Sequence, residues 1–489
     1  MKHYDAIVVG GGIIGKGIAL AMAGEGWETV CIDAEGKGTG VATTAAGAML
    51  GVYGEITAEK AGPIDDAEFE LRRNAAALYQ GWVDAIEALS GRRVRRGMGT
   101  FIIANPAGGL DRANLDAIKA LAARHGDALE NVEPRDVPGL QPNRQFSATG
   151  AVFLPGEGYV HSLDLMEAIT AAVQNHEHGE VLNDTVTSVR IENNRAIGVI
   201  TEGHGAISAD VVILAAGIGI PKIVEESLGL AEVVPPMVGG KGVSLVIESK
   251  VQLEHVIRTP NRDFACGTHL VPRGGTLTYV GATNRIGDTP GSESGVSAGE
   301  VHSLLASAIE EVNTDIRTAS VVSQTFGSRP VTFDRYPVIG ETGIGGLFLA
   351  TGTYRNGVLM APAISNYIKD AICNKTDAIP DYFGPRLRAA NPVATSQDLD
   401  TAITQGVRDL VSFIQEPRGW LPYNRTEELR NFVEVLLKMT LRPNPELDAL
   451  RAECVDLLER FPIPEVVPRL FYDFNERMSQ ESGTVHARY

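Results

Sequence analysis

The first glycines of the chain have the spacing needed to bind a dinucleotide. Gly10, Gly12 and Gly15 fill the pattern G-x-G-x-x-G directly after the apolar run 6–9. The first glycine permits a tight turn, the second lets a pyrophosphate approach the backbone, and the third lets a helix lie close to the sheet. The free N–H groups at the start of that helix then point at the phosphates. The spacing therefore predicts an adenine dinucleotide site.

An acidic residue at the end of the next apolar run supports this interpretation. Residues 29–33 read Thr-Val-Cys-Ile-Asp and predict a second strand. Asp33 has about the spacing expected of a carboxylate that accepts both ribose hydroxyls, which disfavours a 2′-phosphate there. A glycine-rich turn can arise by chance, but here the strand, helix, second strand and acid occur in the expected order.

The elements that must position this site follow along the chain. Small residues at 42–50 could lie against a cofactor, and the apolar runs 210–217 and 346–352 each predict a buried strand that ends in small residues. A helix starts at about Asn356, and its N-terminus can hold a second electron-rich part of the cofactor. Periodicity predicts helices over 66–89, 110–125, 163–174 and 300–312, and strands over 94–103, 153–160, 181–192 and within 238–283.

Composition narrows the class of protein. The 489 residues suffice for two or three domains. With 43 basic and 61 acidic residues, the net charge of −18 argues against nucleic acid or an anionic membrane as a partner. The four cysteines are far apart, which is typical of a reducing compartment. Neither a membrane span nor a signal peptide is predicted, so we expect a cytoplasmic protein.

Residues 379–489 differ in character from the rest of the chain. Prolines interrupt their first part, and three amphipathic helical stripes follow over 403–414, 429–437 and 447–458. We expect a helical extension that packs on its own chain or on a subunit partner, so a homo-oligomer could form through these helices.

Four motifs in this order resemble the D-amino-acid oxidase superfamily, and specifically its glycine oxidase branch. They are Val9-Gly-Gly-Gly-Ile-Ile-Gly15, Ala45-Ala-Gly-Ala-Met-Leu50, Gly327-Ser-Arg-Pro330 and Gly352-Thr-Tyr-Arg-Asn-Gly-Val-Leu-Met-Ala-Pro362. The resemblance covers roughly residues 3–375 and implies FAD as the dinucleotide. Some sarcosine oxidases of the superfamily tether FAD to a cysteine near the position of Arg329. Because no cysteine occurs between Ser320 and Ala371, we expect non-covalent FAD.

The resemblance also implies the fold. We expect a combined α/β and α+β architecture, in which a Rossmann-like FAD-binding domain carries an inserted antiparallel-sheet substrate domain and a C-terminal helical extension. The expected ranges are 1–88, 148–228 and 322–378 for the discontinuous FAD-binding domain, 89–147 and 229–321 for the substrate domain, and 379–489 for the extension.

Cofactor-binding residues are carried over from the resemblance. It places Ile13 and Ile14 at the pyrophosphate, Asp33 and Ala34 at the ribose, and the backbone of Val186 at the adenine end. The flavin side is expected to be formed by Thr43, Thr44, Gly47, Ala48 and Met49. The remaining residues expected near the cofactor are Ala216, Gly217, Gly352, Thr353, Tyr354, Arg355, Asn356, Gly357, Val358 and Leu359.

Two arginines and a tyrosine are candidates for substrate binding. An arginine fork matches a carboxylate bidentately, and the resemblance gives Arg329 that role. A salt bridge that closes a proline-rich loop is the alternative for Arg329. Arg355 lies where the family has an arginine beside the substrate, but it could instead form an ion pair at the start of the helix. Tyr354 could pack near the flavin ring or in the core.

His269 and Asn284 depart from the family pattern. The family often has an aromatic hydroxyl at the position of His269 and an apolar residue at that of Asn284. His269 could hydrogen-bond a substrate, act as a base near neutral pH, or be a structural histidine. The two polar changes suggest an amine substrate that is larger or more polar than glycine.

Oxidative deamination is the reaction that fits these residues. A hydride passes from Cα to FAD, and the imine hydrolyses to a keto acid or glyoxylate, with reoxidation by O₂ to H₂O₂. No catalytic acid or base is required, and no triad or metal cluster is predicted. An N-carboxymethyl amine is an alternative substrate. Two further functions also fit this pattern of residues: a dehydrogenase that passes electrons to a quinone or protein, and a flavin-binding interaction subunit.

Overall fold

A computed structural model describes most of the chain. The described residues are 3–34, 42–58, 62–106, 110–231, 233–235, 237–262, 266–287, 295–332, 335–373 and 381–385. The chain divides into two compact units, of which the larger comprises 1–106, 110–261 and 268–395. The smaller comprises 107–109, 262–267 and 396–489. Because the described residues end at 385, the helices predicted over 403–414, 429–437 and 447–458 lie outside them.

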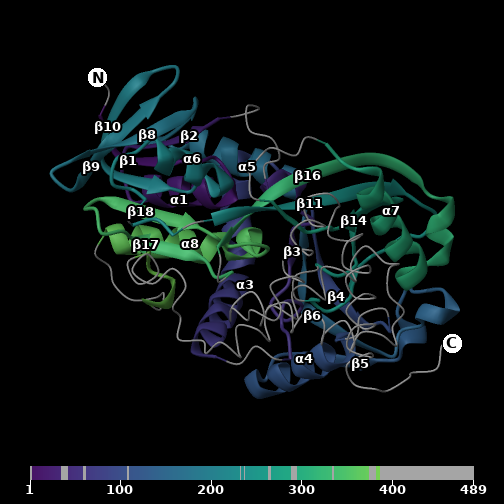
Figure 1. The fold of residues 1–489 in the computed structure, drawn as a ribbon. Coiled ribbons are helices and arrows are strands. Elements are labelled where there is room, and N and C mark those ends of the chain that lie inside the picture. The colour runs from purple at the N-terminus through teal and green to yellow at the C-terminus, as the bar shows by residue number, and fades with distance from the viewer. Residues whose placement is uncertain are drawn as a thin grey trace, which may run out of the picture. The chain divides into compact units, whose positions relative to one another are not determined.

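The first sheet has a parallel centre. Its order is β17-β18-β10-β1-β2-β7, and β1 (His3–Val9) pairs in parallel with β10 (Gly205–Leu214) and β2 (Thr29–Asp33) (Figure 1). Ala6, Ile7, Val8 and Val9 are all buried, which accounts for the unbroken apolar run. The other strands are β7 (Gly179–Asn183), β17 (Val338–Glu341) and β18 (Leu347–Thr351), with the hairpin of β8 (Val186–Glu192) and β9 (Arg195–Thr201) attached through β9 to β10.

Four helices pack together beside this sheet. α1 (Ile13–Gly24) contacts α5 (Ser162–Asn175) and α8 (Gly357–Ile372), and α3 (Pro63–Ser90) contacts the same two helices (Figure 1). α3 begins three residues before the predicted start. The reason is a local cap: a proline occupies its first turn, and the Asp65 carboxylate accepts a hydrogen bond from the Gly62 N–H at 3.1 Å.

The second sheet is mostly antiparallel. Its order is β15-β11-β14-β13-β12-β4-β6-β3, and β16 also pairs with β11 while β5 pairs with β6. β11 (Met237–Glu248) and β16 (Ser320–Thr332) form its longest antiparallel pair (Figure 1). The other strands are β3 (Met49–Leu50), β4 (Arg96–Ala104), β5 (Glu130–Val132), β6 (Gly150–Val160), β12 (Val256–Arg258), β13 (His269–Gly274), β14 (Leu277–Gly281) and β15 (Arg285–Gly287).

Two helices pack against strands of the second sheet: α4 (Asp111–His125) contacts β4 and β6, and α7 (Ala298–Ser307) contacts β11 and β14. α4 matches the helix predicted over 110–125, and α7 is continued by a wider π-helical turn over Ala308–Val312. The remaining short segments are α2 (Ala42–Ala45) and α6 (Ile220–Glu225). No helix of the described ranges is long and apolar enough to cross a bilayer.

Two strands of the second sheet lie wholly or mostly within ranges expected for the FAD-binding domain. β6 hydrogen-bonds to β4 and β3, and β16 hydrogen-bonds to β11, so both belong to the second sheet. β6 lies within the expected range 148–228, and β16 begins two residues before the expected range 322–378. Apolar alternation identifies a strand but not its partner, because pairing is decided by contacts between distant residues. The division into domains stays a prediction.

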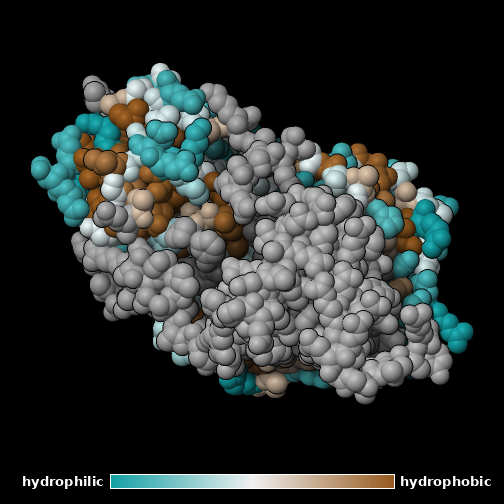
Figure 2. All heavy atoms as spheres, viewed as in Figure 1, coloured by the Kyte–Doolittle hydropathy of each residue, from teal (hydrophilic) through white to brown (hydrophobic). Residues whose placement is uncertain are grey.

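Hydrophilic and hydrophobic residues are interspersed on the face shown in Figure 2. Among the described residues, the exposed large hydrophobic side chains are spread over several elements, with for example Leu78 on α3, Leu163 on α5 and Val322 on β16. Scattered exposed hydrophobic residues are normal on a protein surface. They do not identify a docking site.

Candidate functional site

The glycine turn between β1 and α1 has no room for side chains. Gly10 has φ of +105°, and a Cβ there would lie 2.7 Å from the backbone of Ala215. A Cβ on Gly15 would collide with the carbonyl of Gly10. Gly12 precedes α1 without a side-chain cap, while the Ile13 N–H donates to Thr43 Oγ1 at 3.3 Å. This open helix N-terminus fits the phosphates of a dinucleotide.

Asp33 reaches the same turn from the end of β2. A Cβ on Gly11 would collide with the Asp33 carboxylate. Lys16 of α1, which the sequence analysis missed, places its Nζ 3.8 Å from Asp33 Oδ2. Asp33 is partly exposed, so its carboxylate remains accessible for ribose hydroxyls. Ala34 follows at the end of the strand, and Val186 is buried at the start of β8.

The segments expected to surround FAD come together in the structure. A Cβ on Gly357 would lie 2.9 Å from Thr353 Oγ1 and 3.7 Å from Cδ1 of Ile14, so the start of α8 abuts the start of α1. Thr43 contacts Ile13, as described above, and Ala216 lies against Gly10. Val358 and Leu359 have their side chains in the hydrophobic core, which leaves only their backbone available to a cofactor. The remaining residues expected here, Thr44, Met49, Gly217, Gly352 and Asn356, lie on the segments next to these contacts.

Arg329 lies on β16, where it pairs with Gly240 of β11, and its guanidinium extends over Gly242 of the same strand. Its Nη1 donates to the Thr283 carbonyl at 3.2 Å and to Asn284 Oδ1 at 3.1 Å. A Cβ on Gly242 would collide with the guanidinium, which therefore needs glycine beneath it. Within the described ranges Arg329 has no ion pair, and its Nη2 and Nε have no acceptor. The alternative of a salt bridge is therefore not found there, and these N–H groups can donate to a carboxylate.

Replacing Gly242 with alanine is expected to displace the Arg329 guanidinium. We expect kcat/KM for a carboxylate substrate to fall by about 10- to 100-fold, because misplacing a binding group by ~1 Å has effects of this size. FAD content should stay unchanged. Gly81→Ala is the control, since no atom lies within 4 Å of a Cβ built on Gly81. Equal kinetics for Gly242→Ala and wild type would show that the guanidinium does not need this position.

A hydrogen-bonded chain connects four of the predicted substrate residues. Fully buried Asn284 receives the bond from Arg329 and donates through Nδ2 to the Tyr354 hydroxyl at 2.5 Å. Arg355 donates through Nη2 to the same hydroxyl at 2.9 Å, and its guanidinium carbon lies 4.6 Å from the centre of the Tyr354 ring. Tyr354 has φ of +48°, which is unusual for a residue with a side chain.

The chain ends in buried charges that the sequence analysis missed. Arg355 Nη1 donates to Asn261 Oδ1 at 2.5 Å and lies 3.9 Å from Glu55 Oε2. Glu55 also accepts from Arg258 Nη2 at 3.0 Å, and Arg258 is only 2% exposed. The ion pair that was the alternative for Arg355 is therefore present, and its partner is a distant loop residue.

The charges around Glu55 fix its ionisation. Burial raises the pKa of its carboxyl, but the guanidinium groups of Arg258, Arg355 and Arg72 together outweigh burial and lower the pKa to about 2. Glu55 is thus a carboxylate at neutral pH, and it compensates the positive charge beside the Tyr354 hydroxyl.

His269 faces the same side of the second sheet as Arg329. It pairs directly with Gly281, which pairs with Ser244, which pairs with Thr325 on β16. Because side chains alternate along a strand, Thr325 and Arg329 point to one face, and His269 shares it. His269 is 5% exposed, and its ring stacks on Tyr279 with centroids 6.0 Å apart. Whether it contacts a substrate stays a prediction.

The fold and this site define a dinucleotide-dependent oxidoreductase, with a nucleotide-binding sheet whose centre is parallel and a second, mostly antiparallel sheet that carries Arg329. Residues 5–371 match the family described as FAD dependent oxidoreductase, and the chain belongs to this family. FAD as the cofactor is thereby confirmed. Among the described residues, no group of three or more histidine, cysteine, aspartate or glutamate side chains could hold a metal ion.

Relatives narrow the branch of the family. Glycine oxidase from Geobacillus kaustophilus (strain HTA426) is 28% identical over 390 residues, which cover 77% of this chain and 95% of that protein. A crystal structure of glycine oxidase from Geobacillus kaustophilus superposes with a TM-score of 0.68 at 25% identity, covering 78% and 98% of the two chains. The predicted glycine oxidase-like branch and the class of FAD-dependent amine or amino acid oxidoreductase are confirmed.

A second solved structure shares the fold. Iminodiacetate oxidase from Chelativorans sp. BNC1 superposes with a TM-score of 0.65 at 21% identity, covering 78% of this chain and all of that one. At this identity the likeness supports the two-sheet architecture alone.

Proposed function

We propose that the protein oxidises the Cα–N bond of a small amine that bears a carboxylate, either an amino acid or an N-carboxymethyl amine. The observation that carries this proposal is Arg329, whose Nη1 is fixed by protein acceptors while Nη2 and Nε remain available for a ligand. The likeness to glycine oxidases supports an amine that carries a carboxylate next to the reacting carbon.

The side chains of the site bind and orient the substrate. Arg329 binds the carboxylate, and the hydrogen bond from its Nη1 to Asn284 holds the guanidinium plane against rotation. Residues 43–49 and 353–359 hold the flavin part of FAD, which supplies a two-electron acceptor for the hydride that leaves Cα. The protein mainly has to hold Cα of the substrate close to the flavin, because the hydride passes directly to the flavin. A neutral amine then loses a single proton to form the imine, so no side chain is required as an acid or base.

The overall reaction balances with water and oxygen. The substrate loses a hydride and a proton to become an imine, and water converts the imine to a carbonyl compound and a free amine or ammonia. The two electrons and two protons reduce O₂ to H₂O₂. A substrate larger than glycine is favoured by the polar side chains of His269 and Asn284, which lie on the Arg329 side of the second sheet.

A peroxide assay across a substrate panel tests this proposal. The purified FAD-loaded protein is incubated in air with glycine, sarcosine, D-amino acids and N-carboxymethyl amines, and H₂O₂ and the carbonyl product are measured. We expect peroxide and carbonyl product in equal amounts with at least one carboxylate-bearing amine. Bleaching of the flavin absorbance without peroxide would indicate a dehydrogenase instead. Absence of peroxide in air, together with absence of bleaching by any amine when O₂ is removed, would indicate a flavin-binding subunit and contradict the proposal.

A further inference from the structure

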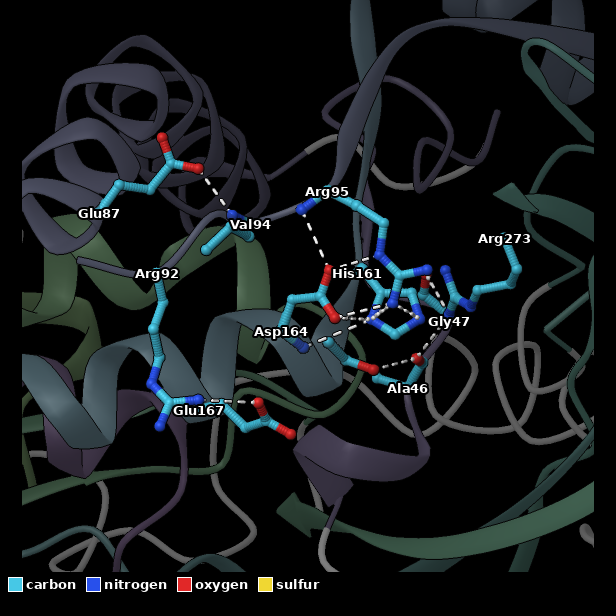
Figure 3. A network of polar contacts seen from close by, with 11 residues as sticks. Ala46, Gly47, Glu87, Arg92, Val94, Arg95, His161, Asp164, Glu167 and Arg273 are labelled. Carbon is cyan, nitrogen blue, oxygen red and sulfur yellow. Dashed lines mark hydrogen bonds and ion pairs between the residues drawn. The ribbon is translucent and has the colours of Figure 1, made fainter. Parts of the chain in front are cut away.

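Side chains of the second sheet hold three successive backbone carbonyls of the segment expected beside the flavin. The Tyr279 hydroxyl donates to the Ala45 carbonyl at 3.0 Å. Arg273 Nη2 donates to the Ala46 and Gly47 carbonyls, both at 3.3 Å (Figure 3). Tyr279 and Arg273 lie on neighbouring strands, β14 and β13, and the Arg273 guanidinium carbon is 4.9 Å from the Tyr279 ring centre. Ser162 at the start of α5 also donates to the Ala46 carbonyl at 3.2 Å, whereas among these donors Arg273 alone reaches the Gly47 carbonyl.

These contacts determine where the next N–H groups point. In a trans peptide the carbonyl and the following N–H point in opposite directions. Because Arg273 holds the carbonyls of Ala46 and Gly47, the N–H groups of Gly47 and Ala48 face away from the second sheet. Both residues are buried, and neither N–H has an acceptor among the described residues. Buried backbone N–H groups are nearly always paired, so these two point to a bound acceptor.

The local backbone shape supports an acceptor at this place. Ala48 has φ of +52°, and its own carbonyl accepts from the Val160 N–H at 3.0 Å. Consecutive N–H groups at a turn into the left-handed region form a concave site for electron-rich atoms. A left-handed conformation in an alanine is retained where the surrounding contacts impose it.

Burying the charged side chain of Arg273 costs free energy of folding. Its side chain is 8% exposed, and burial lowers the pKa of its guanidinium. Within the described part of the chain it forms no ion pair, and its Nη1 has no hydrogen-bond partner. The nearby Asp164 carboxylate is bound instead by Arg95, at 2.6 and 2.8 Å (Figure 3). A buried cation that has two carbonyls and one aromatic ring as partners, and no carboxylate among the described residues, is retained at a cost in stability.

We propose that Arg273 is a positioning residue for the flavin: through the Ala46 and Gly47 carbonyls it directs the N–H groups of Gly47 and Ala48 at an electron-rich edge of the ring system. This inference rests on the placement of the flavin along residues 43–49 that is part of the proposed function. Two fixed N–H donors stabilise negative charge on the ring system, which increases on reduction. Arg273 therefore raises the midpoint potential of the flavin as well as its affinity.

Arg273→Gln tests the inference without an activity assay. The variant is reconstituted with FAD, and the FAD dissociation constant, the flavin absorption spectrum and the midpoint potential are compared with those of wild type. We expect binding weaker by about tenfold or more, which corresponds to ~1.4 kcal/mol, together with a shifted absorption band and a lower midpoint potential. Arg95→Gln is the matched control, because Arg95 belongs to the same network and its side chain bonds His161 and Asp164, whereas the Ala46 and Gly47 carbonyls are bonded by Arg273.

A second variant keeps the test decisive if Arg273→Gln fails to fold. Tyr279→Phe removes the hydroxyl that donates to the Ala45 carbonyl, and it should change the same three quantities in the same direction by a smaller amount. Folded variants with wild-type FAD affinity, spectrum and potential would overturn the inference. Its failure is distinct from failure of the proposed function: altered flavin properties in a protein that oxidises no amine would sustain the inference and reject the function.

Discussion

Glu55→Gln is expected to lower the free energy of unfolding by about 3 to 5 kcal/mol, the range for removing one partner of a buried ion pair. The Glu55 carboxylate lies between Arg258 and Arg355, whose side chains are 2% and 9% exposed. Glutamine keeps the shape of the side chain but not its charge. Arg258 and Arg355 would then both lose the charge of the carboxylate with which they form ion pairs.

The effect of Glu55→Gln should depend on pH in a defined direction. The pKa of Glu55 is lowered to about 2 in the folded protein, below its value in the unfolded chain of about 4.3. A carboxyl with a lowered pKa contributes stability above its unfolded pKa, and this contribution is lost as the pH falls through the folded pKa. The difference between wild type and Glu55→Gln should therefore be largest above pH ~5 and vanish near pH ~2.

Urea unfolding of both proteins at a series of pH values measures this difference. Glu254→Gln is the matched control, because Glu254 is exposed and has no ion pair in the described part of the chain. It should change stability by less than about 0.5 kcal/mol at every pH. A Glu55→Gln variant as stable as the control would show that solvent screens these charges.

Local patterns in the sequence were sufficient to predict the elements that bind the nucleotide. The turn at Gly10, the strand that ends at Asp33 and the helix that begins at Gly357 each depend on residues within about one element of each other. Glycine and apolar runs determine such features through backbone sterics and burial. The family resemblance then supplied Arg329, whose own neighbours in the chain carry no signal for a carboxylate.

The contacts that complete the site join residues far apart in the sequence. Arg258 and Glu55 are separated by 203 positions, and Arg273 and Gly47 by 226. No periodicity or capping pattern records such a pair, because it forms only when two sheets and a loop meet. Glu55 therefore reads as an ordinary polar loop residue, and Arg273 reads as the end of a strand. The same limit applies to β6, whose partners β4 and β3 are not indicated by its own residues.

Arg329→Ala is expected to lower kcat/KM for the best carboxylate substrate of the peroxide panel by about 30- to 4,000-fold. This range corresponds to a loss of about 2 to 5 kcal/mol in transition-state stabilisation. The guanidinium is held by Thr283 and Asn284, so it binds a carboxylate with little further loss of side-chain freedom. Removing it leaves the substrate carboxylate without a charged partner. Arg329→Lys should recover part of this loss, since an ammonium keeps the charge but not the bidentate geometry.

A change in the substrate separates carboxylate binding from a structural effect of Arg329→Ala. The amide of the same substrate lacks the negative charge, so its slower oxidation should differ little between wild type and variant. FAD affinity and the free energy of unfolding should also be similar, because Arg329 has no ion pair within the described residues to lose. An equal loss for acid and amide would assign Arg329 to the support of Asn284 and Tyr354. In that case the carboxylate would have to bind elsewhere on this face of the second sheet.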